Sequence, residues 1–576
     1  MLVCLIFKDL LLERAVGMSE VCVELVGKLV GEMLGLSKEE LSPSDNLISL
    51  GLGSLDIMRI AGLLTKNGCN VTFSELVSNP CMASWVNFAR ERSARSSSNG
   101  SPLLGSANYS KGDPFPITSV QHAYMVGRRD GQELGGTACH AYMEFECGSL
   151  DAAKLERAVE LLILRHPMLR ARFSDDGTAR IEDKVTWKGL TTYRVEGAGN
   201  PDSRIEGIRQ ELSHLRFDIE QDDLIDVRLT VVSPKRTIMH INVDLLAADV
   251  LSIQVLLEDL AHLYDGTDLA PIEIDFMEYA RRTGIGEDAR NEDREYWLNR
   301  IDNMPGGPSL PLKAPMESVK RSQFTRMEYL IDSKSWKNFT EKGRQIGVTQ
   351  SMGIAAVYAK ALSRWSEDKK FLLNLPLFNR KPIHPDVDKI VSDFTSLILL
   401  EADCANAISL LELASQMQGR FQQDVAHSSF GAVEVLRELS HRCPNDPKKA
   451  PVVFASNIGT QFISNKVEDV FGPLSKMLAE TPQVLLDHQI YDHKNGLLLA
   501  WDYVSELLDD KIAKQMFEAY CTAVRFYCEN DWSEPFPDLL PPSQRAARAE
   551  ANSEGADLGG GTLHGRFFAR AQAEPD

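Results

Sequence analysis

A segment at residues 93–114, "SARSSSNGSPLLGSANYSKGDP", constrains this chain more than any other feature. It is rich in Ser and Gly and has no apolar periodicity, which is typical of a flexible linker and not of a packed element. About 20 residues of this kind reach on the order of 25 Å. We therefore expect a short unit before the linker and a long unit after it, which can move relative to each other.

The 576 residues are too many for a single core, so several domains are expected. Residues 18–92 are predicted to form a compact helical domain, whose second helix begins at Ser54. The apolar residues of its first helix recur at helical spacing: Val26, Leu29, Met33 and Leu36. Residues 1–17 are apolar, too short to span a bilayer and without a cleavage site, so we interpret them as an N-terminal extension.

From residue 115 onward, segments with strand-like and helix-like patterns alternate. This alternation indicates two α/β halves, one over about 115–290 and the other over about 291–540. The dipeptide Asn495-Gly496 lies between two apolar runs and predicts a β-hairpin. Residues 541–576 do not complete a domain.

Charge and cysteine usage exclude some kinds of partner. The chain has 62 basic and 82 acidic residues and a net charge of −20, whereas nucleic acids and anionic membranes require a basic face. Its ten cysteines include no CxxC pair and no His at metal-ligand spacing, so we expect reduced thiols and no metal site. These features predict a cytoplasmic protein that binds neither nucleic acid nor a membrane.

Ser54 lies in "LGLGSLDIMRI" at 50–60, between glycines and an apolar helical run. A serine at the first turn of a helix is ordinarily an N-cap, which is the structural interpretation. In a four-helix domain of this size, however, the context resembles an acyl or peptidyl carrier protein. That resemblance implies 4′-phosphopantetheine on Ser54, attached by a phosphopantetheinyl transferase, and a helix N-terminus favours its phosphodiester anion. Gly53 stands where carriers usually have Asp.

Eight motifs after the linker resemble, in order and spacing, those of heterocyclisation domains of nonribosomal peptide synthetases. They are "FPITSVQHAYMVGRR" (115–129), "RHPMLRARF" (165–173), "DLLAADVLS" (244–252), "LPLKAP" (310–315), "SDFTSLILL" (392–400), "PVVFASN" (451–457), "TPQVLLD" (481–487) and Trp501-Asp502. The resemblance implies a condensation-type domain of two chloramphenicol-acetyltransferase-like lobes over 115–540. An aryl carrier followed directly by such a domain resembles siderophore synthetases of the pyochelin (dihydroaeruginoate) and yersiniabactin type. Residues 541–576 resemble the start of a truncated adenylation domain.

The chemistry implied by this resemblance needs a group that takes and returns a proton, and Asp487 is the main candidate. In a strand over this motif, Gln483, Leu485 and Asp487 share one face, so Gln483 is a second catalytic candidate. Burial raises the pKa of a carboxyl in a channel. Asn374 matches a family asparagine that hydrogen-bonds the tetrahedral oxygen. The structural alternatives are an Asp that caps a turn and an Asn that binds a strand-end backbone group.

Asp244 and Asp249 stand in the loop where related condensation domains carry HHxxxDG, and both histidines are absent. The resemblance implies that Asp249 forms a buried ion pair that shapes the channel floor, and we predict Arg380 as its partner. Ala455 stands at the position of the family's Thr. Ser456 retains a hydroxyl and is the further catalytic candidate, although strand alternation points it to the opposite face.

The leading hypothesis is an enzyme segment that joins a carrier-bound aryl acid, such as salicylate, to a carrier-bound cysteine and closes a thiazoline. Its expected partners are an aryl-acid-activating adenylation enzyme and downstream adenylation and carrier domains. Serine or threonine in place of cysteine gives an oxazoline. Two alternatives stay open: amide condensation without cyclisation, because of Ala455, and a non-catalytic carrier and docking module.

Overall fold

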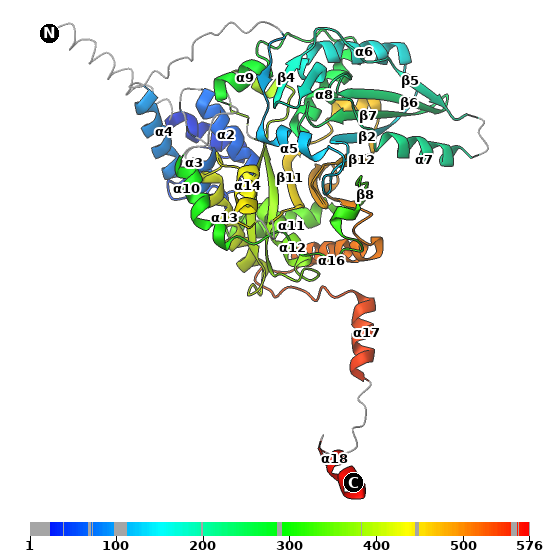
Figure 1. Cartoon of the computed structure of the whole chain (residues 1–576). Helices are drawn as coiled ribbons and strands as arrows, with labels where there is room; N and C mark the ends of the chain where they lie inside the picture. The colour runs from blue at the N-terminus through cyan, green and yellow to red at the C-terminus, as the bar shows by residue number, and fades with distance from the viewer. Residues whose placement is uncertain are drawn as a thin grey trace, which may run out of the picture.

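The structure of the chain is a computed structural model. It describes residues 23–37, 40–66, 69, 71, 73–96, 112–196, 200–284, 291–378, 380–381, 383–443, 448–553, 562 and 564–574. Figure 1 shows a small helical unit beside a large body of two lobes, with a helical extension at the C-terminal end.

The small unit is a helical bundle, as predicted. Its helices are 23–34, α2 (Ser54–Lys66), α3 (Phe73–Ser78) and α4 (Met82–Ser96). Their apolar faces bury Val26, Leu64 and Trp85 completely, and the Trp85 indole donates to the Leu76 carbonyl at 2.9 Å. The predicted apolar stripe is wrong at Met33, which is 37% exposed, whereas Leu34 beside it packs against the core.

The cysteine prediction needs one correction. Cys69, which is buried in the core of the bundle, is disulfide-bonded rather than reduced. A disulfide stabilises a small domain mainly by restricting its unfolded chain. Among the described residues, the free cysteines are Cys81, Cys139, Cys147, Cys404, Cys443, Cys521 and Cys528.

The N-terminal lobe is built on a five-stranded sheet of order β12-β2-β7-β6-β5. Its strands are β2 (His140–Cys147), β5 (Thr191–Arg194), β6 (Ile225–Ser233), β7 (Arg236–Asp244) and β12 (Leu474–Glu480). Helices α6 (Ala152–Arg165) and α8 (Val250–Tyr264) cover one face, where Met143 and Ile241 are buried. Helix α7 (Pro201–Leu212) packs on the opposite face, against Tyr142 and Ile238. Successive side chains along β2 and β7 point to opposite faces of the sheet, and both of these faces are therefore buried.

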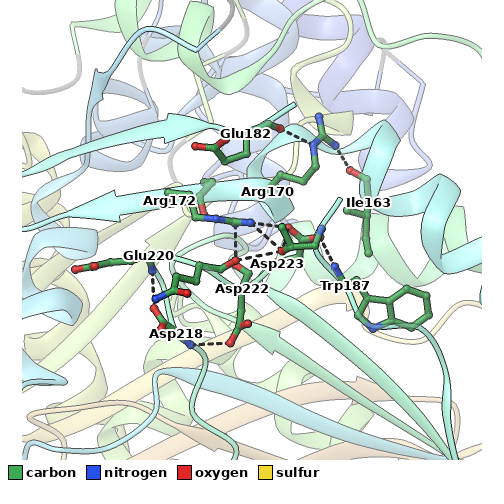
Figure 2. Close-up of polar contacts among 12 residues, drawn as sticks. Ile163, Arg170, Arg172, Glu182, Trp187, Asp218, Glu220, Asp222 and Asp223 are labelled. Carbon is green, nitrogen blue, oxygen red and sulfur yellow. Dashed lines mark hydrogen bonds and ion pairs between the residues drawn. The ribbon is translucent and has the colours of Figure 1, made fainter. Parts of the chain in front are cut away.

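A small sheet of order β1-β4-β3 completes this lobe, with β1 (Phe115–Pro116), β3 (Ala171–Ser174) and β4 (Thr178–Ile181). Figure 2 shows the polar contacts around it. Arg172 pairs with Asp223 at 3.0 Å, and Asp223 also accepts from the Trp187 backbone N–H at 2.9 Å. Arg170 donates to the carbonyls of Ile163 and Glu182. The two arginines of the "RHPMLRARF" motif thus hold loops together. The pattern of "MLRARF" (168–173) predicts a strand, but β3 begins only at Ala171, because Pro167 starts a 3-10 turn over 167–170.

The C-terminal lobe contains a six-stranded mixed sheet of order β10-β9-β11-β13-β14-β8. Its strands are β8 (Phe324–Asp332), β9 (Lys370–Phe378), β10 (Thr395–Asp403), β11 (Val452–Gln461), β13 (Leu486–His493) and β14 (Gly496–Val504). The core on one face is formed with α11 (Ser333–Gln345), α12 (Gln350–Leu362), α13 (Leu410–Ala426) and α16 (Asp510–Glu529). The predicted hairpin joins β13 to β14. Gly496 has φ of 140°, and a Cβ there would lie 1.8 Å from the Ile331 carbonyl oxygen.

The two lobes share a strand. β12 comes from the second half of the sequence but pairs with β2 of the first, at the edge of the N-terminal sheet. The remaining helices are α5 (Ser119–Gly127), α9 (Phe276–Thr283), α10 (Asn291–Arg300), α14 (Ala432–Arg442) and α15 (Asn465–Phe471), with α17 (Pro542–Ser553) and α18 (Gly565–Ala573) in the extension. Within the described ranges, no helix is both long enough and apolar enough to cross a bilayer.

Candidate active site

A cavity of about 550 Å³ lies where the two lobes meet. Helix α5 and the start of α8 line it from the N-terminal lobe, and strands β9, β11 and β13 line it from the C-terminal lobe. On β13 the odd-numbered residues Asp487, Gln489 and Tyr491 face the cavity, whereas His488 faces α16 and bonds the Tyr520 hydroxyl at 2.7 Å. The period of two along β13 therefore supplies a row of polar side chains to the cavity.

Asp487 is a buried carboxyl in this row. Its Oδ2 accepts a hydrogen bond from the Gln489 amide nitrogen at 2.6 Å, and its Oδ1 has no partner in the described part of the chain. Burial, followed by the nearby charge of Asp502, raises the pKa of Asp487 to about 7. A carboxyl with a pKa near neutrality can both take and return a proton, so the geometry suits acid–base chemistry.

Gln483 lines the cavity, but not for the reason that the sequence indicates. Strand β13 begins at Leu486, and Gln483 lies in the preceding loop with φ of 64°. Its backbone N–H donates to the carbonyl of Leu134, which has φ of 53°, at 2.8 Å. The prediction of one strand face for Gln483, Leu485 and Asp487 is therefore wrong, because the left-handed turn at Gln483 breaks the alternation.

The close approach of this loop to α5 requires a glycine. A Cβ at Gly127 would lie 2.8 Å from the Cβ of Pro482. Backbone strain of the kind seen at Leu134 and Gln483 persists only where surrounding structure enforces it, and it is common at functional sites. The "VGRR" portion of the first motif thus acts by shaping the cavity wall.

Asn374 and Ala455 also line the cavity, from β9 and β11, and the Asn374 Oδ1 has no partner in the described part of the chain. Ser456 does not line it. Its hydroxyl lies 2.8 Å from the Ser351 hydroxyl, in a smaller pocket on the opposite face of β11. The placement of Ser456 among the catalytic residues therefore needs correction, because strand alternation turns it away from Asp487.

Asp244 and Asp249 each form a buried ion pair. Arg380 Nη2 donates to Asp249 Oδ1 at 3.0 Å, so the predicted partner is confirmed, and Asp249 also caps α8 through the Ser252 N–H at 2.7 Å. Asp244 pairs with Arg128 at 2.7 Å, a contact that sequence reasoning missed. The "GRR" of the first motif is the signal that could have identified Arg128. Both ion pairs join segments that lie far apart in the sequence, which is the arrangement expected of residues that stabilise the tertiary structure.

Sequence reasoning also missed Asp393, a second buried carboxyl that lines the cavity. Its Oδ1 accepts from the Thr395 N–H at 3.0 Å, and its Oδ2 has no partner among the described residues. Burial raises the pKa of Asp393 to about 7. Its place in the "SDFTSLILL" motif is the signal that could have found it. No group of three or more potential metal ligands occurs in the part of the chain that the structure describes.

The helical bundle contacts the C-terminal lobe beside the smaller pocket. Arg344 Nη1 donates to the Leu50 carbonyl at 3.3 Å, and a Cβ at Gly347 would lie 3.2 Å from the Ser49 hydroxyl. Helix α2 contacts β11, and α3 contacts α13. The smaller pocket contains Ser351 and Ser456, and it shares Pro376 and Phe378 with the main cavity. Helix α2 therefore lies on the side of the C-terminal lobe that carries the smaller pocket.

Comparison with known families identifies both parts. Residues 115–530 match the condensation domain family. The chain belongs to the condensation-domain family of nonribosomal peptide synthetases. Residues 24–89 match the phosphopantetheine attachment site family, so the bundle is a carrier domain whose prosthetic group is 4′-phosphopantetheine. Ser54 is the first residue of a 13-residue helix, and its backbone position fits a phosphodiester. The Ser54 side chain lies outside the described part of the structure.

Two relatives of this condensation-domain protein carry the same pair of domains. It is 35% identical over 95% of its length to phenyloxazoline synthase MbtB of Mycolicibacterium paratuberculosis, of which it covers 47%. It is 34% identical over 96% of its length to pyochelin synthetase PchE of Pseudomonas aeruginosa, of which it covers 38%. The chain thus spans less than half the length of these relatives.

A solved structure agrees with this assignment. The EpoB cyclization-docking bidomain of a nonribosomal peptide synthetase from Sorangium cellulosum is 30% identical and has a TM-score of 0.67, over 73% of this chain and 87% of that one. The predicted fold, a carrier followed by a two-lobed condensation-type domain with cyclisation relatives, is confirmed.

Proposed function

We propose that this condensation-family protein is a segment of a siderophore-type synthetase that joins a carrier-bound aryl acid to a carrier-bound cysteine and closes a thiazoline. The observation that carries the proposal is the Asp487 carboxyl, which lies in a cavity between two lobes. Its pKa is raised, and one of its oxygens has no partner among the residues that the structure describes. The names of the relatives, a phenyloxazoline synthase and a pyochelin synthetase, support ring formation and siderophore chemistry.

Asp487 acts during ring closure. Its carboxylate takes the proton from the thiol as sulfur bonds to the amide carbonyl carbon, and it passes that proton to the former carbonyl oxygen. The nitrogen then loses its proton as the C–O bond breaks and a C=N bond forms, so one water leaves with both hydrogens. The Asn374 amide lines the same cavity, and we propose that it donates a hydrogen bond to the tetrahedral oxygen.

The aryl substrate arrives on the carrier domain. We propose that Ser54, at the start of α2, is the residue that a phosphopantetheinyl transferase modifies and that an aryl-acid-activating adenylation enzyme loads. The prosthetic group supplies a thioester on a long arm. The carrier contact beside the smaller pocket supports entry from that side, and a downstream carrier with the cysteinyl thioester is proposed to enter from the other. We further propose the domain limits 18–92 and 115–540, with an adenylation domain beginning in 541–576.

The function is tested by reconstitution with a phosphopantetheinyl transferase, salicylate, an activating enzyme and a cysteinyl carrier. Intact-mass measurement is expected to show one phosphopantetheine on the wild-type chain and a product one water lighter than the open amide. Ser54→Ala is expected to lose the modification and all product, whereas Ser49→Ala keeps the modification. An open amide as the sole product of the wild type would support condensation without cyclisation, which Ala455 favours.

A second prediction concerns the carrier contact. Arg344→Glu removes the hydrogen bond to the Leu50 carbonyl, and it is expected to lower kcat/KM for carrier-delivered substrate about tenfold, since a bond from a charged donor is lost. Turnover of a soluble thioester of N-acetylcysteamine is expected to stay unchanged. Lys337→Glu makes the same charge reversal two turns earlier on α11 and serves as the control. Equal losses for both kinds of substrate would contradict a docking role.

A further inference from the structure

Gln489 connects Asp487 to two fixed donors. It lies two residues after Asp487 on the same face of β13, and its amide nitrogen donates to Asp487 Oδ2 at 2.6 Å. Its carbonyl oxygen accepts from Arg326 Nη2 at 2.8 Å and from the Tyr491 hydroxyl. Gln489, Asp487 and Tyr491 all line the cavity, so this network belongs to the cavity wall.

The network determines which way the Gln489 amide faces. A guanidinium has donors and no acceptor, so the atom of Gln489 opposite Arg326 has to be the oxygen. Arg326 in turn is held by Asp502 through Nε to Oδ1 at 2.7 Å and through Nη2 to Oδ2. A reversed amide would place its NH₂ against the guanidinium and its oxygen against the Asp487 carboxylate. The N–H of Gln489 therefore faces Oδ2 whether or not Asp487 is ionised.

We propose that Gln489 is a positioning residue that confines the exchangeable proton of Asp487 to Oδ1. Oδ2 already accepts an N–H, and Gln489 offers it no acceptor in this orientation. Oδ1 has no partner in the described ranges, and Ala455, the register partner of Gln489 on β11, brings no hydroxyl to this face. The inference rests on the proposed acid–base role of Asp487, and it assigns the proton transfers of ring closure to one oxygen.

This arrangement has a measurable consequence. The Gln489 hydrogen bond favours the ionised carboxyl and opposes the effect of burial. In the pH–rate profile of ring closure, Gln489→Leu is expected to raise the midpoint of the acid limb by about one pH unit. Gln489→Glu adds a second carboxylate beside Asp487 and is expected to raise that midpoint further. The probe is the benzoyl-cysteinyl thioester of N-acetylcysteamine, given to the full chain over the neutral pH range.

Tyr491→Phe is the matched control, since it removes one donor to the Gln489 oxygen and keeps Arg326. Its acid limb is expected to move less than that of Gln489→Leu. A merely structural role for Gln489 would lower the rate equally at all pH values and leave the limb in place. An acid limb in Gln489→Leu that coincides with that of the wild type would overturn the proposal.

A second measurement does not require turnover. The folded-state pKa of Asp487 is raised above its unfolded value, so ionisation costs stability as pH rises, and the cost levels off above the folded-state pKa near 7. The Tm difference between Asp487→Asn and the wild type is expected to level off there. In the Gln489→Leu background, the same Tm difference should keep increasing up to a higher pH before it levels off. If it levels off at the same pH as in the wild-type background, the positioning role is overturned. Absence of ring closure by the wild type would refute the proposed function alone, because the Tm comparison still reports on Gln489.

Discussion

Asp487→Asn is expected to lower the rate of ring closure by about 100- to 10,000-fold, the range over which a positioned acid–base group contributes. The amide has the shape of the carboxyl but cannot take a proton from the nucleophile. The wild-type rate should rise as pH rises through about 7, because the base is the ionised form and burial has raised its pKa to that value. The variant should lack this rise. Single-turnover assays with the soluble cysteinyl thioester measure both.

The fold of the Asp487 variant is not expected to suffer, since the substitution removes a buried charge and its Tm should be no lower than that of the wild type. Asp492→Asn lies on the same strand, outside the cavity, where Asp492 accepts the Gly459 N–H at 2.7 Å. It is the matched control and should keep the rate on the soluble substrate. Ring closure by Asp487→Asn at the wild-type rate would refute the proposed role of Asp487.

Asp249→Ala is expected to have the largest effect on stability, a loss of about 3–5 kcal/mol in the free energy of unfolding. The substitution leaves the Arg380 guanidinium buried without its carboxylate, and it also removes the cap of α8. Urea unfolding and the Tm measure the loss. An accompanying loss of activity would then follow from the damaged cavity wall and would not identify Asp249 as a reacting group.

The double variant Asp249→Asn/Arg380→Met distinguishes a structural role of Asp249 from a catalytic one. It removes both charges and leaves a side-chain oxygen to cap α8, so most of the lost stability should return, since apolar replacement of a buried ion pair is often nearly neutral. If Asp249→Ala instead unfolds like the wild type and still loses all turnover, Asp249 takes part in the chemistry and its structural assignment is wrong.

Local patterns were sufficient for much of the fold. The glycine-flanked start of α2 at Ser54 and the Asn495-Gly496 hairpin follow from turn and capping chemistry within a few residues. The period of two placed Ala455 toward the cavity and Ser456 away from it, which the structure shows. The Asp249–Arg380 pair joins residues 131 positions apart, and only the ordered family motifs made it predictable.

Other features depend on contacts that no local pattern encodes. Gln483 leaves the strand because Leu134, from the other lobe, binds its backbone. Asp393 and Gln489 become cavity residues only when β10, β11 and β13 meet the N-terminal lobe. Arg326 reaches Gln489 from β8, past the intervening β14.

The sequence by itself determined the two-part architecture, the carrier helix that begins at Ser54 and the candidacy of Asp487, because these depend on periodicity and short motifs. The tertiary structure alone decided the pKa and the hydrogen bonding of the Asp487 carboxyl. Its raised pKa comes from desolvation and from the nearby charge of Asp502, and its Oδ1 has no partner in the described ranges because of how several strands meet. Such effects act through space and not along the chain.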